Sequence, residues 1–285
     1  MSNTPILIVG KTAKTGLRVE RKLQNLGYAT RGVSRSTSPS FDWQDATTWP
    51  DALEGTQSAY VTYYPDLAMP NAEKTVSDFV SMATQTGLKH LVLLSGRGEK
   101  GAERAEGILR NSGLDWNIVR ASWFMQNFSE GFMIEGILNG ELKLPAGQTT
   151  EPFIDIDDIA DVVVASLTQP DLRNRLFEVS GPRALSFAQC TEQIAAAVGY
   201  PVKFTQIPVE DFIQPLREQG LPEEMLWLMR ELFTVVLDGR NSKPVFGVEE
   251  ALGRPATDFN EYLCKVMLSK AWNRDGLIQQ GPAHG

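Results

Sequence analysis

A glycine-bearing turn near the N-terminus is the part of this sequence whose residue types and spacing best match a known binding chemistry. The residues Ile6 to Val9 form a short apolar run typical of a buried strand. A helical pattern begins at about Thr15, and the turn between strand and helix consists of Gly10, Lys11, Thr12, Ala13, Lys14, Thr15 and Gly16. A strand, a glycine-rich turn and a helix in this order are the fingerprint of a dinucleotide site.

Each position of the turn has a physical role in that interpretation. Gly10 permits a tight turn, and Gly16 permits close packing of the helix on the strand. The amides at the start of the helix hold the pyrophosphate, and Lys11 and Lys14 add positive charge. Ala13 replaces the glycine at which the backbone comes nearest to the pyrophosphate. The alternative is an ordinary turn with two solvated lysines.

The end of the second predicted strand indicates which dinucleotide would bind. An NAD site places an acidic residue about 20 positions beyond the turn, but residues 27 to 41 contain no Asp or Glu. The segment instead carries donors suited to a 2′-phosphate, namely Arg31, Ser34, Arg35 and Ser36. A solvated basic loop is the alternative. We therefore predict NADP(H) as the cofactor.

The elements that would position these residues alternate along the first half of the chain. Short apolar runs predict strands at 6–9, 28–33, 59–62, 91–94, 116–119 and 176–179. Helices are predicted at 15–26, 72–86 and 99–112, each followed by a glycine. This alternation, with buried strands that show no alternation of apolar and polar residues, predicts an α/β fold: a Rossmann-like, doubly wound parallel sheet with helices on both faces.

The later sequence is less regular. Residues 152–156 are predicted to form a strand that enters a helix capped by Asp157, and further helices are predicted at 186–198, 223–237 and 258–271. Pro201, Pro208, Pro215 and Pro222 are expected to break the intervening segment. We expect a dinucleotide-binding domain over 1–180, a small, mostly helical substrate-binding lid over 181–273, and an unanchored tail over 274–285.

Several motifs in a shared order resemble a known family. They are the turn itself, Phe41-Asp42-Trp43, Ala59-Tyr60-Val61, Leu91 to Ser95, Val119 to Asn127, and Pro152 to Ala160. Together they resemble the NmrA-like branch of the atypical short-chain dehydrogenases over about residues 5 to 270. Within it, the pattern is most similar to the reductases of ergot-alkaloid pathways, of the festuclavine-forming type.

The resemblance implies roles for individual residues. Residues 10 to 16 would hold the pyrophosphate, and Arg35 the 2′-phosphate. Asp42, beside Trp43, would accept a hydrogen bond from the adenine amino group. Tyr64 and Ser95 would lie along the nicotinamide ribose, with Ser95 as the candidate polar contact to the reacting group. The substrate pocket would be lined by Trp123, Phe124 and Asn127, although aromatic residues after a strand also commonly belong to the core.

One departure from the wider superfamily limits the chemistry. Standard short-chain dehydrogenases use a Tyr-x-x-x-Lys pair for proton transfer to a carbonyl oxygen, whereas this sequence has no tyrosine between Tyr64 and Tyr200. Hydride addition to an iminium carbon or a conjugated carbonyl compound develops no localised alkoxide and needs a strong acid less. The sequence therefore favours an NADPH-dependent reductase. A non-catalytic NADP(H)-responsive sensor of the NmrA kind is the alternative, and an epimerase or dehydratase is a weaker one.

Composition excludes other classes of function. With 35 acidic and 27 basic residues, the chain has a formal charge of −8, a poor match to nucleic acid or anionic membranes. The two cysteines and two histidines form no zinc motif and no disulfide framework, so no metal is expected. Without a signal peptide or a long apolar run, we expect a cytoplasmic protein whose partner is a small-molecule substrate. The sequence does not indicate an oligomeric state.

Overall fold

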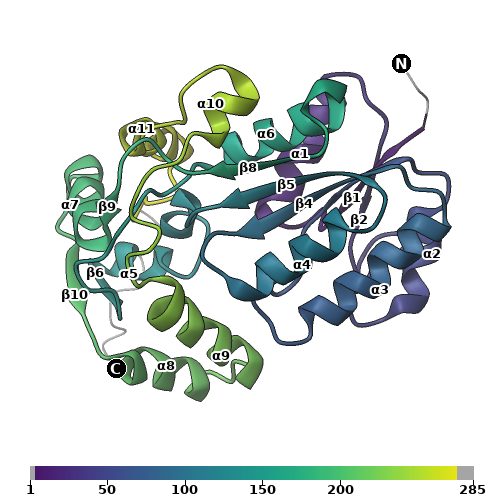
Figure 1. Ribbon diagram of the computed structural model, residues 1–285. Coiled ribbons are helices and arrows are strands. Elements are labelled where there is room, and N and C mark those ends of the chain that lie inside the picture. The colour runs from purple at the N-terminus through teal and green to yellow at the C-terminus, as the bar shows by residue number, and fades with distance from the viewer. Residues whose placement is uncertain (1–3, 275–285) are drawn as a thin grey trace, which may run out of the picture. The chain divides into compact units, whose positions relative to one another are not determined.

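The computed structural model describes residues 4–274 and contains a six-stranded parallel sheet (Figure 1). Its strands lie in the order β2-β1-β3-β4-β5-β8, and every neighbouring pair is parallel. Their bounds are β1 Ile6–Val9, β2 Thr30–Val33, β3 Ser58–Val61, β4 His90–Gly96, β5 Asp115–Ala121 and β8 Arg175–Val179. The strand order reverses at β1, which is where open α/β sheets bind their ligands.

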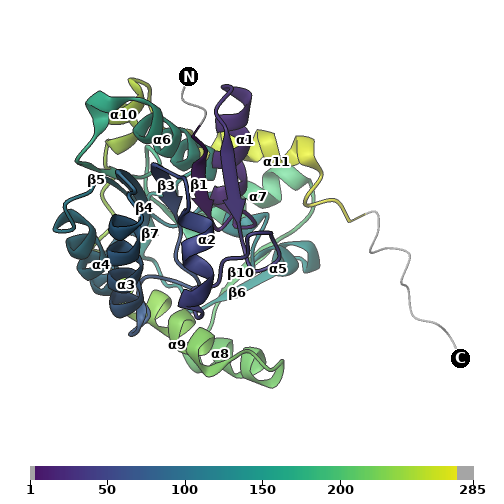
Figure 2. The same ribbon diagram turned by 90° about the vertical axis from the view of Figure 1, so that its right-hand side faces the viewer.

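Helices cover both faces of this sheet, as the alternation predicted. On one face α1 (Lys14–Asn25) packs beside α6 (Ile156–Thr168), and α6 also contacts α10 (Gly247–Leu252). On the other face α3 (Ala72–Gln85) and α4 (Lys100–Arg110) lie side by side, next to the short α2 (Trp49–Leu53) (Figure 2). The prediction of a Rossmann-like, doubly wound sheet is confirmed.

The chain divides into two compact units that are not continuous in sequence. Unit 1 contains the large sheet and is made of the chain up to Ser122, Ile156–Ser180 and Val245–Ala256. Unit 2 is made of Trp123–Asp155, Gly181–Pro244 and the chain from Thr257 onward. A single boundary at residue 180 therefore does not describe this division, because residues 123–155 group with the later chain and residues 245–256 return to the sheet. Apart from Arg274, the tail expected at 274–285 lies outside the described residues.

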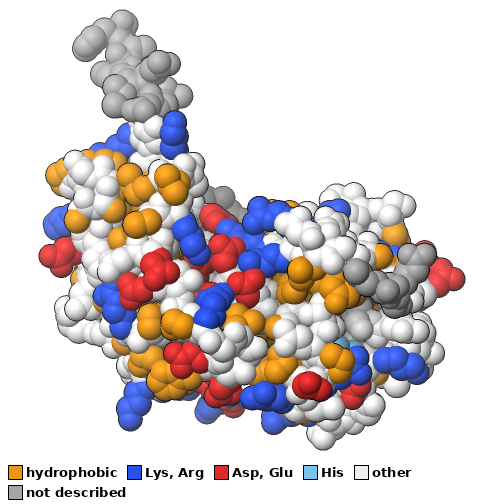
Figure 3. All heavy atoms as spheres, turned by 90° about the horizontal axis from the view of Figure 1, so that it is seen from above, with side chains coloured by type: hydrophobic (Ala, Val, Ile, Leu, Met, Phe, Trp, Pro, Cys, Tyr) orange, Lys and Arg blue, Asp and Glu red, His pale blue; other side chains and the backbone are white. Residues whose placement is uncertain are grey.

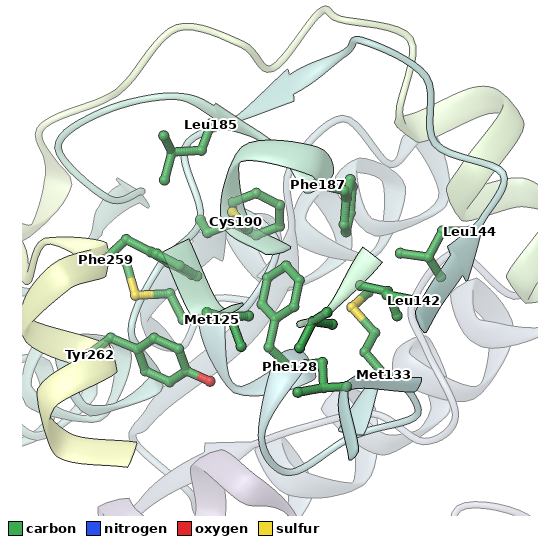
Figure 4. Close-up of a cluster of buried hydrophobic side chains, with 14 of the residues drawn as sticks. Met125, Phe128, Met133, Leu142, Leu144, Leu185, Phe187, Cys190, Phe259 and Tyr262 are labelled. Carbon is green, nitrogen blue, oxygen red and sulfur yellow. The ribbon is translucent and has the colours of Figure 1, made fainter. Parts of the chain in front are cut away.

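The core of unit 2 combines aromatic side chains with leucines and methionines (Figure 4). The rings of Phe128, Phe153, Phe187 and Phe259 pack on one another, with centroids 5.0 to 6.5 Å apart. These four phenylalanines lie far apart in the sequence. The elements of unit 2 are a 3-10 turn at Met125–Phe128, α5 (Ile134–Asn139), β6 (Glu141–Leu144), β7 (Thr150–Glu151), β9 (Leu185–Ser186), α7 (Phe187–Val198), β10 (Lys203–Gln206), α8 (Val209–Glu218), α9 (Glu223–Glu231), a π-helical turn at Leu232–Val236, and α11 (Phe259–Ser269).

Two helix starts in unit 2 follow the sequence signals, whereas the strand predicted at 152–156 is wrong. Ser186 forms a capping box with Gln189 at the start of α7, and Asp258 caps α11. In contrast, β7 spans only Thr150–Glu151, and α6 already begins at Ile156. Asp157 therefore lies within the first turn of α6 rather than at its cap. A negative charge in the first turn is stabilised by the positive end of the helix dipole.

Three further observations concern a proline in a helix, the surface charges and the length of the helices. Pro215 lies inside α8 and does not end it, contrary to the expected break; an interior proline removes one backbone donor and can kink a helix without ending it. On the face drawn in Figure 3, acidic and basic side chains are interspersed. Among residues 4–274 the structure contains no helix with the length and apolar character needed to cross a membrane.

Candidate cofactor site

The turn after β1 is closed by backbone hydrogen bonds. The amides of Gly10 and Lys11 both donate to the carbonyl oxygen of Val33 at the end of β2, at 3.2 and 3.1 Å. The Ala13 amide donates to the Gly10 carbonyl oxygen at 2.8 Å. Gly10 has a φ of 87°, a conformation that costs glycine little and other residues more. The first glycine of the motif is therefore required by the backbone.

Gly16 is required by a close approach between helix and turn. A Cβ atom on Gly16 would lie 2.1 Å from the Gly10 carbonyl oxygen, well inside van der Waals contact. The missing side chain lets α1 start directly against the turn. The spacing of the two glycines thus has a geometric cause in this chain.

The start of α1 offers backbone donors. Ala13 occupies the N-cap position and has no side-chain oxygen, and in the described chain no side chain caps this helix. The first turn contains no acidic residue. Amides at a helix start carry partial positive charge and bind anions such as phosphate. An anion can therefore meet these amides without first displacing a cap.

Lys11 is directed away from the turn. Its Nζ lies 3.7 Å from a carboxylate oxygen of Glu20, a buried residue of α1. Both side chains cross Gly32 in the middle of β2, where a Cβ atom would lie 2.5 Å from the Glu20 carboxylate and 2.7 Å from the Lys11 stem. In this structure Lys11 forms an ion pair with Glu20.

The loop after β2 presents one arginine at its tip. Ser34 begins a turn in which its amide donates to Thr37 Oγ1 at 2.8 Å, and the hydroxyls of Ser34 and Ser36 lie 3.1 Å apart. The exposed Arg35 extends from this turn and lies 5.6 Å from the ring centre of Tyr64, a residue of 62% relative exposure. A cation over an aromatic ring is held weakly and remains available to a ligand.

Arg31 does not share this role. Its guanidinium donates to the carbonyl oxygens of Ala52, at 3.1 Å, and of Glu54, and so satisfies carbonyls at the end of α2. The expectation that Arg31 helps to hold a 2′-phosphate is therefore not supported. A sequence pattern cannot detect this engagement, because the partners lie more than 20 positions away.

Asp42 and Trp43 are held in a structured step after β2. One Asp42 carboxylate oxygen accepts the Gln44 amide at 3.0 Å, and the Asp42 carbonyl oxygen accepts the Trp49 indole N–H at 2.7 Å. The Trp43 indole N–H donates to the Thr62 carbonyl oxygen, and its ring packs on Phe79 at 5.1 Å. At 9% exposure Trp43 belongs to the core. Asp42 is left with one carboxylate oxygen that no described residue engages.

Ser95 lies near the carboxyl end of β4 and is only 4% exposed. Its hydroxyl donates to a carboxylate oxygen of Glu106 on α4 at 2.6 Å. Arg120 of β5 binds the same carboxylate, with Nε at 2.8 Å from one oxygen and Nη2 at 2.5 Å from the other. Glu106 and Arg120 were not among the residues that the sequence singled out. No distinct signal marked Arg120, because its strand, DWNIVRA, also contains Asp115 and Asn117.

The three residues expected at the substrate pocket belong to unit 2 and are half-buried. Trp123 packs on Phe187, with ring centroids 5.5 Å apart, and on Phe233, at 5.2 Å. Phe124 forms an isolated β-bridge with Ile154, and the Asn127 amide donates to the Phe124 carbonyl oxygen. Phe233 lies in the π-helical turn at Leu232–Val236, and such turns frequently occur at functional sites.

Comparison with known proteins identifies the family. The family model described as the NmrA-like family matches residues 103–263. The prestalk A differentiation protein A of Dictyostelium discoideum is 30% identical over 87% of this chain and 81% of its own length. The chain therefore belongs to the NmrA-like family, as the sequence motifs indicated.

Other relatives carry the names of oxidoreductases. The NAD(P)H azoreductase of Xenophilus azovorans is 28% identical over 90% of this chain and 96% of its own length. The agroclavine dehydrogenase of Claviceps fusiformis is 26% identical with the same two coverages, which confirms the predicted resemblance to ergot-alkaloid enzymes.

Solved structures agree with the fold. A nucleoside-diphosphate-sugar epimerase of Staphylococcus aureus superposes with a TM-score of 0.78 at 16% identity, over 91% of this chain and 99% of that one. The NADPH-dependent quinone oxidoreductase of Escherichia coli superposes with a TM-score of 0.76 at 16% identity, over 92% and 99%.

Proposed function

We propose that this protein is an NADPH-dependent reductase of the atypical short-chain dehydrogenase type, acting on a small organic molecule. The observation that carries the proposal is the uncapped start of α1 behind the Gly10–Gly16 turn, placed beside a β2 end that lacks an acidic residue. The first feature suits a pyrophosphate and the second suits a 2′-phosphate. The names of the relatives, which include an NAD(P)H azoreductase and agroclavine dehydrogenases, support it.

The residues of unit 1 fit this cofactor as follows. The amides at the start of α1 would hold the pyrophosphate, and Arg35 with the hydroxyls of Ser34 and Ser36 would hold the 2′-phosphate. Asp42 would accept the adenine amino group through its second carboxylate oxygen, and the exposed Tyr64 would lie along the nicotinamide ribose. When bound, the cofactor supplies hydride. The protein supplies its position.

The acceptor we propose is an iminium or a conjugated carbonyl compound. Between Tyr64 and Tyr200 the chain has no tyrosine. It therefore lacks the residue that would protonate the alkoxide formed from a simple ketone. Trp123, Phe124 and Asn127 would contact the acceptor, with the aromatic residues supplying flat apolar surface.

The cofactor is tested by titrating the protein with NADPH and with NADH. We expect NADPH to bind at least about tenfold more tightly, since a charge-assisted contact to the 2′-phosphate is worth about 1.5–3 kcal/mol. Arg35→Ala should remove most of this preference. Arg31→Ala is the matched control: it removes an arginine from the same segment, but one that binds the end of α2, so the preference should remain. Equal affinities for the two dinucleotides in the wild-type protein would contradict the proposal.

The enzymatic role is tested by NADPH consumption with a panel of cyclic imines, conjugated carbonyl compounds and dyes. Turnover with any of them supports a reductase. A protein that consumes no NADPH with the panel, yet binds NADP+ and NADPH with clearly different affinities, would instead be a redox sensor, because only a difference in affinity can shift an equilibrium.

A further inference from the structure

A row of polar side chains crosses the carboxyl end of the sheet in unit 1. Ser95 of β4 is in register with Arg120 of β5, and Arg120 is in register with Glu178 of β8. Each is the residue before the last of its strand. Residues in register on neighbouring strands present their side chains to the same face, which here is the face covered by α4.

Glu106 of α4 binds two residues of this row, Ser95 and Arg120. The residue has no exposed surface, and its carboxylate accepts three hydrogen bonds, one from Ser95 and two from Arg120. Arg120 also lies 3.9 Å from Glu178, which Arg97 binds through Nε at 2.5 Å. A buried carboxylate is tolerated only when it is paired and hydrogen-bonded in this way. Both oxygens of Glu106 are therefore committed as acceptors.

The contact decides what Ser95 can offer to a bound molecule. A serine hydroxyl has one hydrogen and two lone pairs. Its hydrogen is given to Glu106, and withdrawing it would leave a buried carboxylate short of one donor. Towards any group that binds at the carboxyl end of β4, Ser95 can therefore only accept a hydrogen bond.

We infer that Ser95 accepts a hydrogen bond from the group that is reduced, and that this group is a protonated imine bearing an N–H rather than a carbonyl. The inference rests on the proposed reductase function and narrows its acceptor. Ser95 is then a catalytic residue in contact with the substrate. Glu106 and Arg120 are positioning residues, because they act through the direction of the Ser95 hydroxyl.

The chemistry balances for such an acceptor without a protein acid. Hydride, one proton with two electrons, adds to the iminium carbon, and the π-electron pair of the C=N bond moves onto nitrogen. The products are a neutral amine and oxidised NADP+, and no proton is taken from the protein. A carbonyl acceptor would leave a charged oxygen in need of a proton, and the hydroxyl proton of Ser95 is already donated to Glu106.

The experiment compares three acceptors of similar size near neutral pH. Protonated dihydroisoquinoline carries an N–H, N-methyl dihydroisoquinolinium carries the same charge without an N–H, and cyclohexenone presents a carbonyl oxygen. For the wild-type protein we expect kcat/KM to be highest for the first, about tenfold above the N-methyl compound. Ser95→Ala should bring these two compounds within about twofold of each other, mainly through KM. Glu106→Gln should do the same, because Ser95 is then free to turn its hydrogen outward.

A binding measurement separates this inference from the function on which it rests. Calorimetry should show that tetrahydroisoquinolinium binds more tightly than its N,N-dimethyl derivative, and that Ser95→Ala removes the difference. Ser95→Ala keeps the Glu106–Arg120 pair, so it stays informative if Glu106→Gln does not fold. The control is Ser166→Ala, which removes another buried serine hydroxyl, one that donates within α6 to the Val162 carbonyl oxygen. It should leave both preferences unchanged.

The outcomes are distinct. Turnover of cyclohexenone with none of the imine would overturn the role of Ser95 and leave the reductase in place. Unchanged preferences in Ser95→Ala would overturn it as well. If no acceptor is consumed, the reductase proposal fails, and equal calorimetric affinities for the two ammonium compounds would then overturn the Ser95 inference separately.

Discussion

Replacing Gly16 by alanine is the most direct test of the geometry of the turn. The added Cβ atom would lie 2.1 Å from the Gly10 carbonyl oxygen and 2.9 Å from its carbonyl carbon, whereas real Cβ atoms keep at least 3.0 Å from such neighbours. The obstacle is backbone, so no rotamer change relieves it. The start of α1 and the turn after β1 must move apart.

The magnitude follows from two opposing effects. Overpacking a closely packed position costs about 1–3 kcal/mol, and a backbone obstacle places Gly16→Ala at the upper end. Alanine regains about 1 kcal/mol over glycine in a helix. We expect a net loss of about 2 kcal/mol in the free energy of unfolding, which lowers the melting temperature by about 4–8 °C for a domain of this size.

Gly107 of α4 provides the matched control. It is also a glycine in a helix, but a Cβ atom there would meet nothing within 4 Å. Gly107→Ala should therefore show only the gain in helix propensity, about 1 kcal/mol of added stability. The same chemical change in two helices should differ by about 3 kcal/mol, with opposite signs.

The assay combines thermal unfolding with calorimetric titration of NADPH. Gly16→Ala should weaken NADPH binding at least about tenfold, because the displaced amides at the start of α1 no longer point towards the phosphates. Gly107→Ala should bind as the wild-type protein does. If Gly16→Ala melts at the wild-type temperature and binds NADPH with the wild-type affinity, the close approach of helix and turn is refuted.

Three other outcomes follow from single contacts. Ala13→Gly should leave dinucleotide affinity unchanged or tighten it, since it removes a methyl group beside the proposed phosphate position; a several-fold weaker Kd in the same titration would count against that placement. Asp258→Asn removes an ion pair with Arg183 but keeps a capping side chain on α11. The Arg183 guanidinium lowers the pKa of Asp258, so the pair stabilises the protein above the ordinary pKa of the carboxyl, and this contribution is lost as the pH falls through the lowered value. Urea unfolding should therefore show a deficit of at most about 1 kcal/mol at pH 7 that disappears in acid; a deficit that persists in acid would exclude the ion pair as its cause. Tyr262→Phe removes a 2.8 Å hydrogen bond to the buried Ser129 hydroxyl and should cost about 1–3 kcal/mol in the same assay, whereas an unchanged midpoint would show that the bond contributes nothing.

The large sheet and the turn could be predicted because their signals are local. Several strands of unit 1, such as β1 and β4, contain short apolar runs. Three of the helices end near Gly27, Gly87 and Gly113, all with positive φ. Alternating elements of this kind can bury their strands only between two layers of helices. The sequence by itself thus determined the doubly wound fold, the place of Gly10 and Gly16, and the helices that begin near residues 186 and 258.

Tertiary structure alone decided features that depend on residues far apart in the chain. The assignment of residues 123–155 to unit 2 follows from packing among Phe128, Phe153, Phe187 and Phe259, which no short-range periodicity encodes. Arg31 looks like a phosphate ligand until its carbonyl partners beyond residue 50 are known. A serine hydroxyl can donate or accept a hydrogen bond. The hydroxyl of Ser95 donates to the buried Glu106 carboxylate, which Arg120 also binds, so towards another group it is left to accept. The direction of a hydroxyl hydrogen is set by its neighbours in space, and those neighbours are brought together only when helix and strands have packed.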